Sequence, residues 1–271
     1  MDEKTSGCLK QTAIGCGVLI VIAIAIPLVM AVKIMGPFNR AVENRHAIEE
    51  RFGLQEAYVP PASGAPSADR VEVFLEVRRT LRLPCMELSR AEQQVRKLES
   101  FDDQDEVNRV EVLKQAFSTT KSMMGVGPVI GRLYQLRNQS LLDAGMGLGE
   151  FTYIFTVAYR DRLLHPPESD QLFGPTATNR RVRKALLSML ESQLAVLRSE
   201  GGDEAEIAAL AAEISAMQTD ENRIPWQDDF PPAITEAFAP YRTELDELYC
   251  PAMAPLELMI NEKRGPAVES P

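Results

Sequence analysis

The sequence offers few side chains of the kinds that perform catalysis or bind metals. Only two histidines occur, His46 and His165, which removes most routes to a Ser-His-Asp nucleophile or an imidazole metal site. Glu43 and His46 have the Glu-x-x-His spacing of a helical metal pair, but a di-metal bundle needs two such pairs and further carboxylates. We interpret this pair as part of a solvated helix face. No catalytic residue, metal site or cofactor is predicted, and enzymatic activity is left open but not favoured.

Two glycine-rich runs raise the question of a phosphate-binding loop. They read GVGPVIGR at 125–132 and GMGLGE at 145–150. A phosphate cradle needs a strand before the glycines and a helix after them, whereas helical patterns flank both runs on each side. We expect both runs to be joints between helices, with Pro128 in the first turn of the following helix.

Two of the four cysteines lie in the predicted body of the protein. Cys85 in LPCMEL and Cys250 in LYCPAM each stand beside a proline. In an exported protein, two such cysteines suggest one disulfide between the first and last helices of a bundle. A buried pair of free thiols is the alternative, and a cytosolic body would favour it.

Four basic residues, Arg180, Arg181, Arg183 and Lys184, gather in NRRVRK near the expected start of a helix. The helix dipole disfavours cations at that end, so the charges need a partner. Neighbouring carboxylates of the acidic body are the simpler candidates. An anionic partner, such as a lipid head group or a cell-wall polymer, is the alternative.

The only tryptophan, Trp226, lies in the proline-rich loop ENRIPWQDDFPPAI. A tryptophan in such a loop can fold back as a lid over the core, which is the interpretation we favour. It can also anchor an interface with a partner protein.

Residues 13–32 form a run of twenty positions without a charge. A helix that spans the roughly 30 Å core of a bilayer needs about 20 mostly apolar residues, and Lys10 and Lys33 flank the run. A cleaved signal has a shorter apolar region followed by a small-residue cleavage site. A lipoprotein motif would end its apolar region at the cysteine, whereas Cys16 lies near the start. We therefore predict a retained single-pass transmembrane helix, a signal anchor with the lipid bilayer as its partner.

The sidedness of this anchor is argued from its flanks. Lys33, Arg40, Arg45 and Arg51 follow the span, and the positive-inside rule would place them in the cytoplasm. A short amino-terminal tail before a single span instead favours export of the long body. We favour a body on the periplasmic side of the plasma (inner) membrane, because Arg45 and Arg51 lie far from the span.

The charge of the chain lies in its body. The formal net charge is −10, and residues 1–57 hold six acidic and six basic side chains, so the acidic excess falls in residues 58–271. Such a body lacks the basic surface that a nucleic acid requires. It is also repelled by anionic lipid.

The remaining chain reads as helical. From Asp69 onward apolar residues recur at spacings of three and four, with no sustained strand-like alternation, which predicts an all-α soluble bundle of about six or seven helices. We expect Pro84 to kink the first helix and Gly201-Gly202 to separate two later ones. One long last helix is expected to include residues 234–252. The predicted segments are a tail at 1–12, the span at 13–32, a charged helical stalk at 33–57, a Pro/Gly/Ser linker at 58–68, the helical domain at 69–262 and a flexible tail at 263–271.

These features predict a membrane-anchored helical binding or scaffolding module of the cell envelope, with a membrane or envelope protein as a candidate partner. The alternative is an envelope enzyme, such as a carboxylate-dependent hydrolase of cell-wall glycan. An enzyme should show a pocket with clustered, desolvated carboxylates. A binding module should show an apolar or single-sign surface instead.

Overall fold

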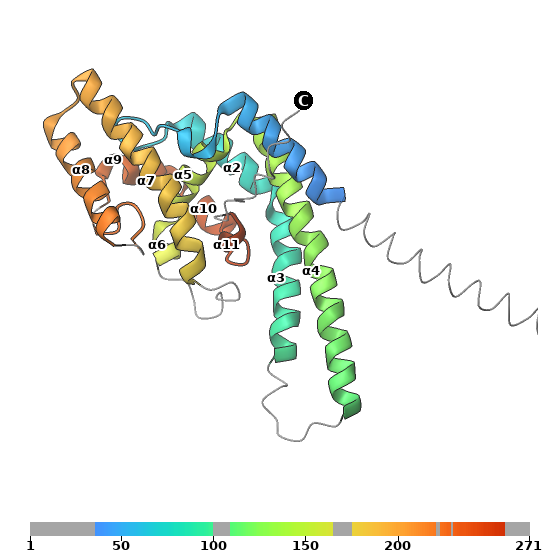
Figure 1. The fold of residues 1–271 in the computed structure, drawn as a ribbon. Coiled ribbons are helices and arrows are strands. Elements are labelled where there is room, and N and C mark those ends of the chain that lie inside the picture. Colours follow the sequence, from blue (N-terminus) through green and yellow to red (C-terminus); the bar gives the residue numbers. More distant parts are fainter. Residues whose placement is uncertain (1–35, 100–108, 165–174, 221–222, 229, 258–271) are drawn as a thin grey trace, which may run out of the picture.

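The computed structural model describes residues 36–99, 109–164, 175–220, 223–228 and 230–257. All the regular elements within these ranges are helices (Figure 1), which confirms the all-α prediction. None of these helices is both long and apolar enough to cross a bilayer. The predicted span at 13–32 and the predicted tail at 263–271 lie outside the described residues.

The described elements outnumber the six or seven helices that the sequence predicted, because several of the expected helices are divided. A helix at residues 36–52 comes first. It is followed by η1 (Gln55–Ala57), α2 (Ala68–Thr80), α3 (Arg82–Glu99), α4 (Arg109–Ala144), α5 (Leu148–Ala158), α6 (Arg160–Leu164), α7 (Pro175–Glu200), α8 (Glu204–Thr219), α9 (Pro232–Phe238), η3 (Ala239–Tyr241), α10 (Arg242–Leu248) and α11 (Ala254–Glu257).

Prolines account for the division of the last expected helix. The single helix predicted over residues 234–252 is wrong, because Pro240 falls in the 3₁₀ turn between α9 and α10, and Pro251 follows the end of α10. A proline lacks the N–H that continues a helix. The predicted bend near Pro84 is present: α2 ends at Thr80, and Pro84 lies in the first turn of α3, where its missing N–H is not needed.

The two glycine-rich runs differ in structure: one joins two helices, and the other lies inside a helix. Gly145 ends α4 in the left-handed region (φ 67°) and Gly147 caps α5, so this run is a joint as predicted. The joint predicted at 125–132 is wrong, because α4 continues through it with Pro128 inside the helix. Gly131 has a packing role instead: a Cβ there would lie 2.9 Å from a ring carbon of Phe38, so its absence lets the helix at 36–52 approach α4 closely.

α5 lies at the centre of the body, between α2 and the α7–α8 pair (Figure 1). Nine of its eleven residues are buried, from Leu148 to Val157 with one exception, as expected for a helix with packing partners on every side. Its aromatic rings meet those of α2: the centroids of Phe74 and Phe151 are 5.4 Å apart. This central helix supports the elements that form the candidate site.

The segments predicted as a stalk and a linker pack against the body. Ile48 in the helix at 36–52 is fully buried, and the Asn138 side chain of α4 donates a 2.8 Å hydrogen bond to the Ala41 carbonyl. Residues 58–67 contain no helix, as predicted. They are nevertheless held, because the Tyr153 hydroxyl of α5 donates a 2.7 Å hydrogen bond to the Gly64 carbonyl.

α7 and α8 form an antiparallel pair on one side of the body (Figure 1). α7 ends as predicted at Gly201-Gly202, where Gly201 has φ 72° and the Gly202 N–H donates to the Leu197 carbonyl. Asp203 then caps α8 by accepting a 3.0 Å hydrogen bond from the Ala205 N–H. This tight turn brings α8 back along α7 and fixes one wall of the candidate site.

Candidate functional site

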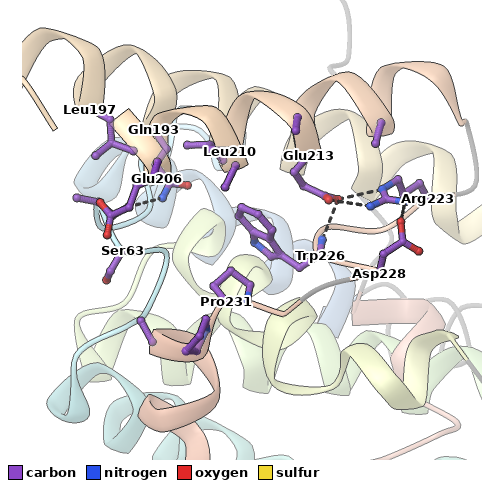
Figure 2. A pocket seen from close by; sticks show the side chains of 17 residues that line it. Ser63, Gln193, Leu197, Glu206, Leu210, Glu213, Arg223, Trp226, Asp228 and Pro231 are labelled. Carbon is purple, nitrogen blue, oxygen red and sulfur yellow. Dashed lines mark hydrogen bonds and ion pairs between the residues drawn. The ribbon is translucent and has the colours of Figure 1, made fainter. Parts of the chain in front are cut away.

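A cavity of about 630 Å³ lies along α8 (Figure 2). Its walls come from α7, from α8, from the loop at 223–228, from the start of α9 and from residues 62–63. Small-molecule sites in proteins have volumes of about 300–1,000 Å³ and are mostly apolar, with a few placed polar groups. The volume and the lining of this cavity fit that description.

The wall formed by α8 is a row of alanines. Ala205, Ala209, Ala212 and Ala216 recur at spacings of four and three, so they share one face of the helix. The opposite face of α8 packs into the core and includes Ile214, of which 6% is exposed. The alanines leave room because they carry no side chain beyond Cβ.

Trp226 forms the wall that faces α8. Its side chain is 7% exposed and belongs to the hydrophobic core, so it both covers the core and lines the cavity. Its backbone lies in the left-handed region (φ 60°), which costs about 1–2 kcal/mol for a residue other than glycine. Two charged side chains hold this conformation: Glu213 accepts a 2.8 Å hydrogen bond from the Trp226 N–H, and Arg160 donates a 2.7 Å hydrogen bond to the Trp226 carbonyl.

Glu213 belongs to an ionic cluster at one end of the cavity (Figure 2). Arg223 donates two hydrogen bonds to it, of 3.1 and 2.8 Å, and a third of 2.5 Å to Asp228. The hydrogen bond to Glu213 is the main cause that raises the pKa of Arg223. Because both oxygens of Glu213 are engaged, this carboxylate serves to position Arg223 and Trp226.

Gln193 and Glu206 line the other end of the cavity, near Ser63 (Figure 2). Gln193 is 2% exposed, and its Nε2 donates hydrogen bonds of 2.8 and 3.0 Å to the Pro61 and Ala62 carbonyls. Its Oε1 has no hydrogen-bond partner in the described part of the chain. A buried acceptor without a partner costs about 1–3 kcal/mol, which a bound donor would recover.

No protein-family model, curated protein or solved structure matches this chain.

The basic cluster predicted from NRRVRK lies further into its helix than expected. α7 begins at Pro175, so the cluster falls beyond the first turn. Arg183 donates hydrogen bonds to the Met217 and Asp220 carbonyls at the carboxyl end of α8, where a cation is favourable. Lys184 is exposed. The side chains of Arg180 and Arg181 lie outside the described ones, so the anionic-partner hypothesis stays a prediction.

Cys85 in the first turn of α3 and Cys250 after α10 are joined by a disulfide, with their Cα atoms 6.0 Å apart. Glu43 and His46 are both exposed on the helix at 36–52, which agrees with a solvated face. Among the residues described, no group of three or more His, Cys, Asp or Glu side chains is placed to hold a metal ion.

Sequence reasoning identified Trp226 but missed its neighbours in the cavity, notably Gln193, Glu213 and Arg223. One signal for the site was present. In EAEIAALAAEISAMQT, the alanines at 205, 209, 212 and 216 repeat with a helical period. They lie opposite the face that carries the larger apolar residues Ile207, Ile214 and Met217. The partners of Trp226 come from three separate elements, and no local pattern brings them together.

Proposed function

We propose that this protein is a single-pass membrane-anchored helical module of the cell envelope that binds a small ligand in the cavity along α8. The observation that carries the binding role is the cavity itself: about 630 Å³ of space with an alanine-lined wall opposite Trp226. The Trp226 turn is held by Glu213 and Arg160, so that wall does not have to be ordered when a ligand binds, which favours affinity.

The anchoring part of the proposal depends on residues 13–32, whose length and lack of charge suit a bilayer span. The bond between Cys85 and Cys250 supports a body outside the cytoplasm, because structural disulfides persist mainly in oxidising compartments. The proposed place of the protein is therefore the plasma (inner) membrane, with its body on the periplasmic side.

The alternative, an envelope hydrolase that uses carboxylates on cell-wall glycan, has weaker support. An acid–base pair needs carboxylates that are available to a substrate. Within the described part of the cavity, Glu213 is committed to Arg223 and to the Trp226 N–H. Asp228 is also paired with Arg223. Glu206 is the remaining carboxylate among the described lining residues, and it has no second available carboxylate to act with, so the geometry favours binding over hydrolysis.

The binding role can be tested with the full chain in phosphatidylcholine vesicles. Trp226 is the only tryptophan of the protein, so its fluorescence reports on the cavity without interference. A long-chain alcohol with a terminal bromine is the probe, because bromine quenches indole emission on contact. We expect saturable quenching in the natural protein.

Ala209→Phe and Ala208→Phe provide a matched pair for this test. Both alanines are exposed on α8, but only Ala209 lines the cavity. Filling the cavity at 209 should reduce probe affinity at least tenfold, whereas Ala208→Phe should leave it unchanged. Quenching that is absent, or that is equal in both variants, would refute binding in this cavity.

The anchor is tested separately by extraction of membranes with alkaline carbonate. We expect the chain to stay with the membrane pellet, and deletion of residues 13–32 to release it. Recovery of a mature chain that begins beyond residue 35 from the aqueous fraction would contradict the anchor.

A further inference from the structure

The cavity also carries information about the chemistry of its ligand, on the condition that the proposed binding role holds. Its polar groups are unevenly distributed, and most of its charged groups are negative. They lie at its two ends, and the apolar wall lies between them (Figure 2). Each part places a separate demand on the ligand.

The buried amide of Gln193 favours a ligand that can donate a hydrogen bond. Because its Nε2 donates to the Pro61 and Ala62 carbonyls, the orientation of the amide is fixed, and exchanging its nitrogen and oxygen would place two acceptors against each other. The oxygen is therefore the amide atom that has no partner among the described residues. The other unpartnered polar atom of the wall, the indole nitrogen of Trp226, lies near the Tyr153 hydroxyl.

The charges that line the cavity favour a cationic ligand. Three carboxylates line it, those of Glu206, Glu213 and Asp228, against the single guanidinium of Arg223. Arg223 is neutralised by Glu213 and Asp228. Glu206 makes no ion pair with any residue that the structure describes, and it lies at the Gln193 end (Figure 2). An anionic ligand would be repelled here, and an ammonium group would be attracted.

The stretch between the two ends demands an apolar body. Ala209 and Ala212 face it from α8, with Leu197, Leu210 and the ring of Trp226 around them. Removing an alkyl chain from water contributes about 0.8 kcal/mol per buried CH₂.

We infer that the cavity selects an amphiphilic primary ammonium compound, with its head group at the Gln193–Glu206 end and its apolar chain along the alanines of α8. A primary ammonium has both the positive charge that Glu206 attracts and the N–H donors that the Gln193 oxygen accepts. A quaternary ammonium has only the charge, and a carboxylate has neither.

The test uses four probes with the same bromoalkyl chain and different heads: primary ammonium, trimethylammonium, alcohol and carboxylate. Each is titrated against the full chain in phosphatidylcholine vesicles, with quenching of Trp226 as the readout and Ala209→Phe as the background for partition into lipid. We expect the primary ammonium to bind at least tenfold more tightly than the carboxylate. The trimethylammonium and alcohol probes should fall between them.

The Glu206→Gln variant tests whether the head group of the ligand lies beside Glu206, and Glu204→Gln is the matched control. Both glutamates are exposed in the first turn of α8, so the two substitutions change the helix terminus equally, but only Glu206 lines the cavity. We expect Glu206→Gln to weaken ammonium binding about fivefold and to leave alcohol binding unchanged. Glu204→Gln should change neither.

The outcomes separate this inference from the proposed function. If no probe shows quenching that depends on residue 209, the binding role fails and the inference fails with it. If the alcohol binds in the cavity but the carboxylate matches or exceeds the ammonium, the binding role stands and the ligand class is wrong. If Glu206→Gln has no more effect than Glu204→Gln, the assigned position of the head group is wrong.

Discussion

Two of the arginine–glutamate pairs of the body, Arg78–Glu257 and Arg223–Glu213, lie in very different surroundings. The side chains of the first pair are 1% and 0% exposed, whereas those of the second are 13% and 7% exposed. Arg78 also donates to the Leu248 carbonyl, and its guanidinium lies 5.3 Å from the centroid of the Phe155 ring. The first pair is enclosed by protein, while the second lies on the wall of the cavity.

The enclosed pair belongs to a region that holds residues 248–257 against α2, α3 and α4. We call this whole region, with the side chains that contact the segment, the latch. The disulfide from Cys85 to Cys250 and the hydrogen bond from Tyr134 to the Leu256 carbonyl hold the same segment. Burial raises the pKa of Glu257 and lowers that of Arg137. In the latch, ionic groups lie where desolvation opposes their charges.

This difference shows that the role of an ion pair, in folding or in binding, depends on its surroundings. In the latch the bonds join elements that are distant in the sequence, and the ion pair is enclosed by protein. At the cavity the pair positions Trp226 beside open space, and the Gln193 oxygen, which has no partner among the described residues, lies at the other end. Substitutions in the latch should therefore affect folding, and those at the cavity should affect binding.

The largest expected effect comes from breaking the disulfide. The bridged cysteines are separated by 165 residues, and closing a loop of that length removes about 5 kcal/mol of unfolded-state entropy in the chain model. We expect Cys85→Ser and Cys250→Ser to lower the free energy of unfolding by a similar amount in denaturant titrations. Reduction of the natural protein should reproduce the loss. Unchanged unfolding midpoints would show that the bridge does not form.

The next largest effect is expected at the buried pair. Arg78→Met leaves Glu257 as a buried charge without its partner, which should cost about 3–5 kcal/mol. Replacing both residues, as Arg78→Met with Glu257→Leu, removes the unpaired charge and should restore much of the stability. A double variant as unstable as the sum of the two single ones would contradict this account of the latch.

At the cavity, Arg223→Met should have a smaller effect on stability, about 1–3 kcal/mol, because Glu213 is left with one hydrogen bond from the Trp226 N–H. It should also shift the Trp226 emission to longer wavelength as water reaches the ring. Asp228→Asn is the control, since the Asp228 side chain is 75% exposed. Equal emission spectra for the two variants would argue against the clamping role of Arg223.

Alkali should weaken both regions by a common mechanism. Burial raises the pKa of Tyr159 to about 12, and it raises the pKa of Tyr153 as well. These phenols ionise in the unfolded chain at a pKa of about 10, so stability is fully present below pH 10 and falls as the pH rises above it. We expect a loss of about 1 kcal/mol per tyrosine by about pH 11. Circular dichroism with phenolate absorbance checks this, and ionisation well before unfolding would contradict it.

The smallest expected effect on folding comes from the alanine variants. Because Ala208 and Ala209 are both exposed, their replacement by Phe should change the free energy of unfolding by no more than about 0.5 kcal/mol. Thermal unfolding of the two variants should therefore coincide. A large loss in Ala209→Phe alone would mean that its loss of probe binding reflects damage to the fold.

Much of the fold follows from local patterns in the sequence. The helical period of the apolar residues, the stop at Gly201-Gly202 and the joint at 145–150 depend on spacing and on glycine chemistry within one segment. The continuity of α4 past Pro128 does not, because a proline among glycines locally predicts a break, whereas α4 runs through this segment. Similarly, nothing near Trp226 in the sequence indicates that Glu213 and Arg160 hold its backbone.

The central claim, that the cavity holds a small ligand, is tested most directly by native mass spectrometry. The full natural chain, Ala208→Phe and Ala209→Phe would be released from the membranes in which they were produced and weighed intact. We predict that the natural chain and Ala208→Phe carry the same added small mass and that Ala209→Phe lacks it. Three bare chains, or the same added mass on all three, would contradict the claim.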